Sequence, residues 1–275
     1  MNIVIPTYKR PNDQKTWNTL HPDLRQFVTF VVRPEEAEHF RQTYAPSKVM
    51  ETAPHVNDFG STLQFLFDQH EERFIYMDDD LTGFYRRARF WQDPATLDKP
   101  WKKDRLLTAE EQLTMFTDIL ETLNQPYVAS IGCRAGYLPP EGRRFKDAQA
   151  NIQFMAVDGA LVKKIGARWD RIKWASDLDF NLQLNHAGYN TLQRCDYSYT
   201  EPGVFNGEGG SNALLSREQR IATVNEMFEK LVALWPGVFI PSKLTNKNPD
   251  YPKPPYRAQR KKYLQQRRKE LGIVV

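Results

Sequence analysis

The chain has 275 residues, 40% hydrophobic and 26% charged, and its net charge of +4 is modest, as is typical of a globular protein that buries a large core. No apolar run approaches the length of a membrane span, and the first residues lack the charged region and long apolar stretch of a signal peptide. We therefore expect a cytoplasmic protein with no membrane partner. The two cysteines, Cys133 and Cys195, match no metal-binding spacing and suit a reducing compartment.

Short apolar runs alternate with helical patterns over roughly the first eighty residues. The pattern predicts strands at 3–5, 27–32, 48–50 and 74–77, and helices at 35–44 and 60–70. Strands and helices that alternate in this way form a parallel sheet with right-handed crossovers. The predicted fold class is therefore α/β, and its first half is a nucleotide-binding type of unit.

An acidic cluster, Asp78, Asp79 and Asp80, follows the fourth predicted strand. Three neighbouring carboxylates repel one another and raise one another's pKa unless a cation neutralises them. Mg²⁺ and Mn²⁺ bind carboxylate oxygens together with substrate phosphates, and the carboxyl ends of strands in open α/β sheets are where ligands bind. The cluster thus predicts a site for a metal and a phosphate. A solvated acidic turn is the alternative.

Basic and large aromatic residues alternate in the segments 84–91 and 101–105, which follow the acidic cluster. Such a mixture is typical of a surface that stacks bases and neutralises phosphates. An insertion whose aromatic rings pack on the core is the alternative. A capping box then opens a helix that reaches about residue 124. Its predicted inward face consists of Leu113, Phe116, Leu120 and Leu123.

A second acidic site, Asp177 and Asp179, lies at the start of a helix that we predict from Ser176 to Gly188. Acidic residues in a first helical turn are favoured by the helix dipole, and this structural role is sufficient for Asp179 and nearly so for Asp177. A carboxylate at this position that faces a pocket is also a candidate general base. Before it, the Gly/Pro/Arg-rich segment 134–146 predicts a loop that acts as a lid or contacts the acceptor.

The C-terminal region combines a proline-containing connector with a basic helix predicted from about Tyr256 to Leu271. Between residues 243 and 270, ten lysines and arginines stand against two acidic residues. A basic tail on a slightly acidic body predicts a polyanionic partner, with nucleic acid first. A solubilising helix that only ends the chain is the alternative. We place a domain boundary between 1–240 and 241–275.

Three sequence pieces stand in one order: Ile3 to Pro11 (IVIPTYKRP), the acidic cluster, and Ser176 to Asp179 (SDLD). In this arrangement, over roughly residues 1–235, the chain resembles the GT-A glycosyltransferases, which move a sugar from a nucleotide donor with a metal bound by a DxD motif. The resemblance implies a GT-A fold, a Rossmann-like mixed sheet flanked by helices. It also implies Mn²⁺ or Mg²⁺ as cofactor and a nucleotide-sugar donor, with a UDP-sugar as the expected one.

The resemblance assigns roles to residues of the first two pieces. Asp78 and Asp80 form the DxD pair, in which Asp80 binds the metal that bridges the diphosphate and Asp78 lies nearer the ribose. Asp79 stands between them in the same donor site. The residues expected beside the nucleotide base and ribose are Pro6, Thr7 and Arg10. In many inverting members, an acidic residue at the place of Asp177 is the base that takes the proton of the acceptor hydroxyl.

The chain departs from the family pattern in two respects. Many members have Glu where this chain has Ser176, and no histidine follows His186, although a later metal-binding histidine is typical. The third metal ligand therefore stays open, with Glu201, Asn206 and Glu208 as candidates. The base assignment and the inverting stereochemistry stay open with it.

The basic tail and the aromatic-basic insertion resemble those of phage-type glycosyltransferases that decorate hydroxymethylated DNA bases. We therefore expect a hydroxymethylated pyrimidine in DNA as the acceptor, ahead of lipopolysaccharide, protein or a small molecule. Two other classes of function compete. Asp78 and Asp80 also fit the DxDxT motif of haloacid-dehalogenase-like phosphatases, in which the first aspartate attacks phosphorus. A non-enzymatic nucleic-acid-binding protein would explain the tail and the insertion, but not the clustered carboxylates.

Overall fold

The computed structural model of the chain describes residues 1–90, 104–136, 142–172, 176–201, 217–241 and 256–274. In chain order, its elements are β1 (Ile3–Pro6), α1 (Lys15–Thr19), α2 (Pro22–Arg25), β2 (Val28–Val32), α3 (Pro34–Thr43), β3 (Lys48–Glu51), α4 (Phe59–Gln69), β4 (Arg73–Met77), β5 (Gly83–Arg86), the short 3₁₀ helix η1 (Ala88–Phe90), β6 (Arg105–Leu106), α5 (Ala109–Thr122), β7 (Val128–Ala135), β8 (Phe145–Lys146), β9 (Phe154–Asp158), α6 (Gly159–Ile165), α7 (Ser176–His186), β10 (Asn190–Thr200), α8 (Arg217–Leu234), β11 (Phe239–Pro241), β12 (Tyr256–Ala258) and α9 (Arg260–Glu270). The six elements predicted in the first eighty residues are thereby confirmed to within one residue at each end.

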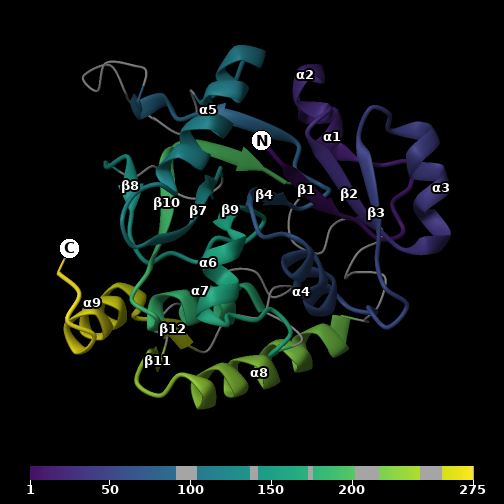
Figure 1. The fold of residues 1–275 in the computed structure, drawn as a ribbon. Coiled ribbons are helices and arrows are strands. Elements are labelled where there is room, and N and C mark those ends of the chain that lie inside the picture. Colours follow the sequence, from purple (N-terminus) through teal and green to yellow (C-terminus); the bar gives the residue numbers. More distant parts are fainter. Residues whose placement is uncertain (91–103, 137–141, 173–175, 202–216, 242–255, 275) are drawn as a thin grey trace.

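Ten strands of the described part form one mixed sheet in the order β3-β2-β1-β4-β9-β7-β10-β5-β6, with β8 beside β10 (Figure 1). β1 lies between β2 and β4 and is parallel to both, as predicted for the first half of the chain. β9 then runs antiparallel between β4 and β7, and β10 is parallel to β7. The predicted mixed α/β architecture is therefore confirmed.

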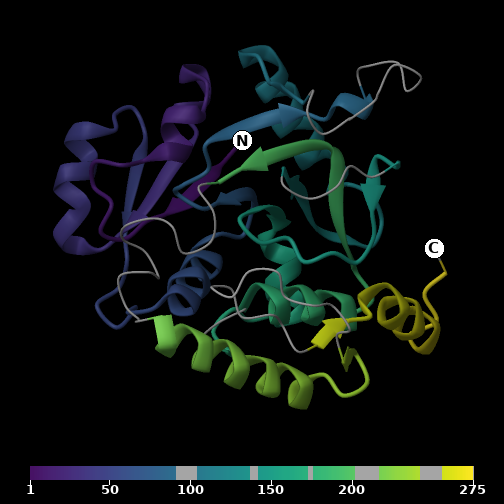
Figure 2. The same cartoon turned by 180° about the vertical axis from the view of Figure 1, so that it is seen from behind.

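Two hydrophobic cores cover the two faces of the sheet, and successive side chains of each strand alternate between them. Ile3 and Ile5 of β1 belong to the core that α1, α2, α3 and α5 cover. Val4 belongs to the core that α4, α6 and α7 cover. Figures 1 and 2 show these helices on both sides of the strands. The side chains of β1 are buried on both faces of the sheet, and the strand is paired on both edges. The loop that follows β1 therefore begins at a fixed position at the edge of the sheet.

A third core joins α7 to the C-terminal elements. Leu182 of α7 is fully buried there, in one cluster with Leu231 of α8 and with Trp235, which follows α8. β11 and β12 form a separate antiparallel pair that packs into the same core, and α9 follows directly after it. None of the helices within the described ranges is both long and apolar enough to cross a lipid bilayer.

Two sequence predictions about the middle of the chain were partly wrong. Leu113 of α5 is 48% exposed, because the inward face of this helix centres on Phe116 and Ile119 and is rotated by about one residue from the predicted face. Arg134 does not open a lid loop, because β7 extends through it. Its side chain is buried and donates a hydrogen bond to Gln193 Oε1 at 3.2 Å.

The prediction of a base-stacking surface in the aromatic-basic segment was also partly wrong. Phe84, on β5, is fully buried against Phe116 and Phe154, and therefore belongs to the core, not to a base-stacking surface. The Arg87 side chain is fully buried too and forms an ion pair with Asp104 at 3.1 Å. Packing of this kind was the alternative that the sequence left open. Residues 91–103, which include Trp91 and Trp101, lie outside the described residues.

Candidate active site

The loop after β1 meets the acidic cluster at the end of β4, because β1 and β4 are neighbouring parallel strands that end at the same edge of the sheet. Thr7 Oγ1 donates a hydrogen bond to Asp79 Oδ2 at 2.5 Å. Arg10 Nη1 donates to Asp79 Oδ1 and, at 3.2 Å, to Asp80 Oδ2. Both oxygens of the buried Asp79 carboxylate therefore hold the loop in place.

Further hydrogen bonds fix the start of α1 to the backbone of the acidic cluster. Gln14 Nε2 donates to Thr7 Oγ1 at 2.9 Å. Thr16 Oγ1 donates to the carbonyl of Asp78 at 2.5 Å and accepts from the backbone N–H of Leu81 at 2.8 Å. These hydrogen bonds lie in buried or partly buried surroundings and tie the loop to the cluster, while Gln14 Oε1 is buried without a hydrogen-bond partner among the described residues.

Asp78 and Glu201 bring two further carboxyl groups to this edge. Glu201 follows β10, and the pairing of Thr200 with Gly83 sets it near the cluster. Burial raises the pKa of Glu201 to about 7, with Asp80 contributing in the same direction. The pKa of Asp78 is raised well above its usual value, first by burial and then by Asp80, although Tyr76 donates a hydrogen bond to its Oδ1. The described part of the site therefore has four carboxyl groups, those of the acidic cluster and Glu201, near the single guanidinium of Arg10.

This donor set fits a hard divalent cation, because carboxylate oxygens are the ligands that Mg²⁺ and Mn²⁺ prefer. Asp78 and Asp80 are the carboxylates that would hold it. Among the described residues, no three His, Cys, Asp or Glu side chains are arranged to hold a metal ion by themselves. The remaining positions would be filled by substrate phosphate oxygens and water, as is usual for Mg²⁺.

The two aspartates of the second acidic site have different environments. Asp179 is 1% exposed and accepts hydrogen bonds from Trp235 Nε1 at 2.7 Å and from Gln183 Nε2 at 2.8 Å. This confirms its predicted structural role. Asp177 lies one residue into α7 and is only partly buried. Burial raises its pKa to about 6, and the nearby Arg260 opposes that rise.

Tyr76 connects the two acidic sites. Its side chain is buried, its hydroxyl bonds to Asp78, and its pKa is raised well above the usual value by burial, by Asp78 and also by the charge of Asp177. The structure therefore brings Asp177 of α7 close to the end of β4, although about a hundred residues separate them in the sequence. A partly buried carboxylate with a raised pKa near the acidic cluster is suited to accept a proton.

The remaining predicted site residues are placed as follows. Pro6 is buried and ends β1 opposite Val31 of β2. Asn206 and Glu208, two candidates for the third metal ligand, lie outside the described residues, whereas Glu201 lies near Asp80. Sequence reasoning missed Tyr76 and Arg260. Tyr76 stands in an apolar run that indicates only a buried strand, and nothing in the basic tail distinguishes Arg260 from its neighbours.

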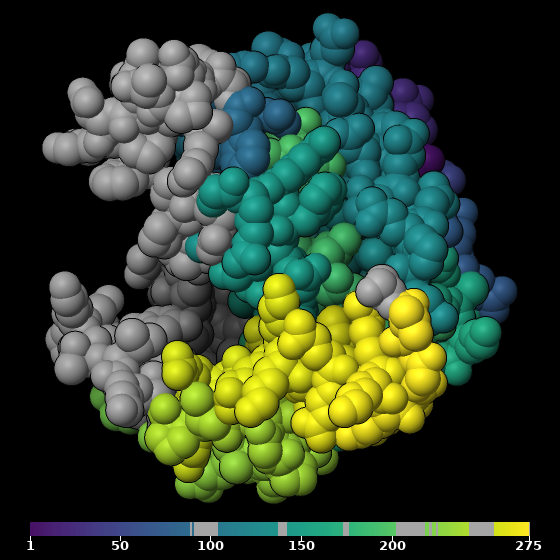
Figure 3. All heavy atoms as spheres, turned by 90° about the vertical axis from the view of Figure 1, so that its left-hand side faces the viewer, coloured from purple at the N-terminus to yellow at the C-terminus, as the bar shows by residue number. Residues whose placement is uncertain are grey.

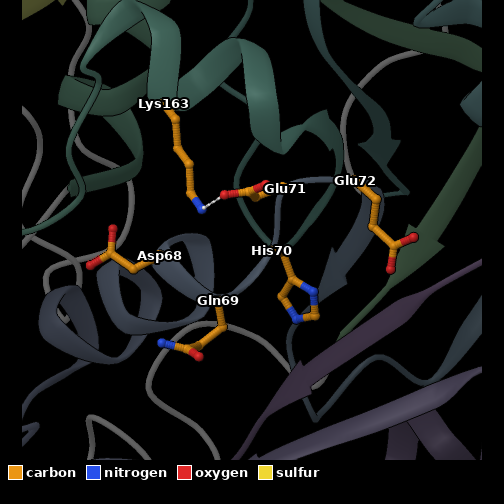
Figure 4. A pocket seen from close by; sticks show the side chains of 6 residues that line it. All are labelled: Asp68, Gln69, His70, Glu71, Glu72 and Lys163. Atoms are coloured by element: carbon orange, nitrogen blue, oxygen red, sulfur yellow. Dashed lines mark hydrogen bonds and ion pairs between the residues drawn. The ribbon is translucent and has the colours of Figure 1, made fainter.

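A hollow of about 410 Å³ lies at the other end of β4 (Figure 4). It is lined by Asp68, Gln69, His70, Glu71, Glu72 and Lys163. Lys163 Nζ and Glu71 Oε1 form an ion pair there at 3.1 Å, and both side chains are solvent-exposed to a considerable degree. Because Glu72 precedes β4 and the acidic cluster follows it, the hollow is separate from the candidate active site.

The sequence matches a protein family described as TET-associated glycosyltransferase over residues 1–210. A comparison with curated proteins gave no match. The match includes the acidic cluster, Asp177 and Glu201, and it ends before α8 and the C-terminal elements.

Among solved structures, the chain is similar to the mannosyltransferase PcManGT from Pyrobaculum calidifontis in complex with GDP-Man and Mn²⁺. The TM-score is 0.51 and the identity 13%, over 91% of this chain and 66% of that one. It is also similar to S. aureus TarS 1–349, with a TM-score of 0.47 and 13% identity over 84% of this chain and 66% of that one. For TarS 1–349 in complex with UDP-GlcNAc, the TM-score is 0.49. This chain thus spans 66% of the PcManGT chain, and the likeness to it confirms the predicted GT-A fold.

Proposed function

Because the chain belongs to the family of TET-associated glycosyltransferases, we propose that it moves a sugar from a nucleotide-sugar donor to a hydroxyl group, and that the acceptor is a hydroxymethylated pyrimidine in DNA. The donor that we propose is a UDP-sugar. The observation that carries the proposal is the meeting of three segments at one edge of the sheet. These are the loop with Thr7 and Arg10, the acidic cluster, and the start of α7 with Asp177.

The donor binds along the loop after β1, with Pro6, Thr7 and Arg10 beside the nucleoside and the diphosphate directed at Asp78 and Asp80. Mn²⁺ or Mg²⁺, held by these two carboxylates, would neutralise the charge that develops on the leaving diphosphate. Asp79 keeps the loop and the cluster in register through its bonds to Thr7 and Arg10. PcManGT, whose fold is similar, is described in complex with both GDP-Man and Mn²⁺, which supports this arrangement.

Asp177 is the base in this proposal. The acceptor hydroxyl attacks the anomeric carbon, its proton passes to the Asp177 carboxylate, and the bond between that carbon and the phosphate oxygen breaks. The electron pair leaves with the nucleoside diphosphate. A base with a pKa of about 6 is ionised at neutral pH and still basic enough to assist proton transfer.

The DNA acceptor rests on the association with TET in the family's description and on basic side chains of the C-terminal elements. The residues of this set that are exposed are Arg257, Lys261, Lys262 and Lys269. Such side chains contribute phosphate contacts that weaken as salt increases. Family membership favours sugar transfer over the phosphatase alternative and over a non-enzymatic DNA-binding protein.

The donor is tested by thermal shift with UDP, GDP, CDP and their sugars, with and without Mn²⁺, on the wild type and Asp80→Ala. We expect UDP and its sugars to stabilise the wild type when Mn²⁺ is present, and this effect to be lost in Asp80→Ala. Asp68→Ala is the matched control, because Asp68 is an exposed carboxylate in the separate hollow at the other end of β4. Stabilisation by none of the nucleotides would contradict the proposed function, and stabilisation by GDP or CDP alone would contradict the proposed donor.

The acceptor is tested with the donor that binds, by following sugar transfer to duplexes that differ at one pyrimidine. Hydroxymethylated duplexes should receive the sugar, whereas unmodified and 5-methylated duplexes of the same sequence should not, since they lack the attacking hydroxyl. Transfer to a protein or lipopolysaccharide acceptor, without transfer to hydroxymethylated DNA, would exclude the DNA acceptor but support the proposed sugar-transfer activity.

A further inference from the structure

The three carboxylates of the acidic cluster differ in how many of their oxygens the protein holds. Both oxygens of Asp79 accept hydrogen bonds from the loop after β1. Asp80 accepts one bond, from Arg10 to Oδ2, and Asp78 accepts one, from the hydroxyl of Tyr76 to Oδ1. Among the hydrogen bonds of the described residues, none involves the second oxygen of Asp78 or of Asp80. Each of the two carboxylates assigned to the metal therefore has one oxygen held by the protein and one left for a ligand.

The side chain of Tyr76 is fixed in the interior of the molecule. β4 is a central strand of the sheet, and Tyr76 pairs there with Val4 of β1 on one side and with Met155 of β9 on the other. Its side chain is 1% exposed and belongs to the core that α4, α6 and α7 cover. The backbone N–H of Asp78 continues the pairing with a bond to the carbonyl of Gln153 at 2.9 Å. Because side chains two residues apart on a strand share a face, the hydroxyl of Tyr76 reaches the Asp78 carboxylate.

The hydroxyl group of Tyr76 is not needed to fill the core. A phenylalanine would occupy the same space, and removing a hydroxyl from water costs free energy unless it finds a hydrogen-bond partner. The partner here is a carboxylate, and a hydrogen bond to a charged acceptor is about twice as strong as one between neutral groups. Such a bond holds the carboxyl group of Asp78 in one orientation, with Oδ1 directed towards Tyr76.

We propose that Tyr76 is a positioning residue for the divalent cation, because its hydroxyl orients the Asp78 carboxylate so that the second oxygen can bind Mn²⁺ or Mg²⁺. The inference rests on the proposed function, in which Asp78 and Asp80 hold this cation. Replacing a residue that is hydrogen-bonded to a metal ligand typically lowers metal affinity by about 10–100-fold. Tyr76 thus acts on the donor through Asp78 and the cation, and not on the nucleoside.

The test compares Tyr76→Phe with Tyr197→Phe, each in the full chain. Tyr197 is the matched control, because it is also buried, with 5% exposure, but belongs to the core on the opposite face of the sheet. Binding of Mn²⁺, alone and with UDP, is followed by electron paramagnetic resonance, in which the signal of free Mn²⁺ falls as the ion binds. The same titrations of Asp78→Ala, with and without Tyr76→Phe, complete a double-mutant cycle. Since phenylalanine fills the same space, we expect Tyr76→Phe to fold, and melting temperatures check this.

We expect Tyr76→Phe to raise the Kd for Mn²⁺ by about 10–100-fold, and the Mn²⁺ concentration for half-maximal sugar transfer to rise with it, while kcat at saturating Mn²⁺ changes by less than about threefold. Tyr197→Phe should match the wild type. In the Asp78→Ala background, Tyr76→Phe should change the Kd by less than about twofold, since the hydroxyl has lost its acceptor. The KM for DNA should not change, because the basic side chains proposed to contact it belong to the C-terminal elements, which Figure 3 shows in yellow at the surface.

An unchanged Kd for Mn²⁺ in Tyr76→Phe would overturn the inference, as would an equally large rise in the Asp78→Ala background. A raised donor KM at saturating Mn²⁺ with an unchanged Kd for Mn²⁺ would overturn it too, and would assign the hydroxyl to the donor. Equal binding of Mn²⁺, or none, by the wild type and Asp80→Ala would show that the cation does not bind to the acidic cluster, which also contradicts the inference. If the wild type binds Mn²⁺ through Asp80 but neither binds nor uses any nucleotide sugar, the proposed function fails, whereas a weaker binding of Mn²⁺ by Tyr76→Phe would still support the role of Tyr76.

Discussion

Arg10 and Asp79, which are 69 residues apart in the sequence, form an ion pair whose two side chains are each only 10% exposed. The pair joins the loop after β1 to the end of β4. The same guanidinium nitrogen also bonds to Asp80, so one cation organises both carboxylates. The part of the site assigned to the nucleoside and the part assigned to the diphosphate are thereby held as one unit before any donor binds.

We expect Arg10→Ala to lower the free energy of unfolding by about 3 kcal/mol at pH 8, because it leaves Asp79 buried without its cation. The pKa of Asp79 is raised to about 6 by burial, even though Arg10 acts to lower it. Without Arg10, this pKa rises further, so the carboxyl is protonated at pH 5 and needs no partner. The loss of stability should therefore be smaller at pH 5 than at pH 8. Urea unfolding at the two pH values measures the difference.

Arg41→Ala is the control for Arg10→Ala. Arg41 pairs with Glu51, but the two side chains are 47% and 42% exposed. Exposed pairs contribute roughly 0–1 kcal/mol, so Arg41→Ala should have a small effect at either pH. Equal losses in the two variants would show that the Arg10 pair is no more than a surface contact.

Asp177 and Asp179 should separate activity from stability. Asp177→Asn removes the base and should lower kcat by about 10²–10⁴-fold, while donor binding and the melting temperature stay close to wild type. Asp179→Asn presents an amide N–H₂ to Trp235 or Gln183, both of which are donors to this side chain, and should destabilise the protein by about 1–3 kcal/mol. Steady-state kinetics and thermal melts of the two variants check this. The assignment is wrong if Asp177→Asn retains wild-type kcat.

Local sequence patterns were sufficient to predict four strands and two helices of the first eighty residues and the position of the acidic cluster, but not the short helices α1 and α2. The apolar run before Asp78 and the alternation of strands and helices depend on residues that are neighbours in the sequence, so they can be recognised without knowing the tertiary structure. The meeting of Thr7 and Arg10 with the cluster followed from the resemblance to GT-A enzymes. The structure adds the reason, which is the pairing of β1 with β4.

The parts that could not be predicted depend on tertiary packing. Tyr76 has the pattern of a core residue, and its bond to Asp78 exists because its hydroxyl reaches the edge of the sheet. Arg260 looks like one more charge in a basic tail, and only the path of α9 buries its Nε. Phe84 and Arg87 belong to a segment with the composition of a nucleic-acid-binding surface, yet Phe84 on β5 and Arg87 just after it lie in the interior. Composition does not say on which side of a sheet a residue lies.

Glu201 makes the candidate site sensitive to pH in a defined direction. Its pKa is raised to about 7 by burial and by Asp80, against 4.5 when it is unperturbed. As pH rises above about 4.5, the unfolded chain loses this proton first, so the folded state becomes less stable relative to it. The full penalty is present above about pH 7, where Glu201 is ionised in both states. A bound divalent cation would remove much of that penalty.

Glu201→Gln should therefore raise the free energy of unfolding by about 1–3 kcal/mol at pH 8, and the gain should vanish as pH falls towards 4.5. If Glu201 is the third metal ligand, Mn²⁺ at pH 8 should stabilise the wild type more than Glu201→Gln. The difference in the free energy of unfolding between the two proteins should therefore narrow or reverse when the metal is added. Thermal melts across pH, with and without Mn²⁺, measure both effects. Glu121→Gln, at an exposed position on α5, is the control and should change stability by less than about 0.5 kcal/mol throughout. A lower stability of Glu201→Gln at pH 8 without metal would refute a penalty from burial and from the charge of Asp80, whereas equal stabilisation of both proteins by Mn²⁺ would remove Glu201 from the metal site.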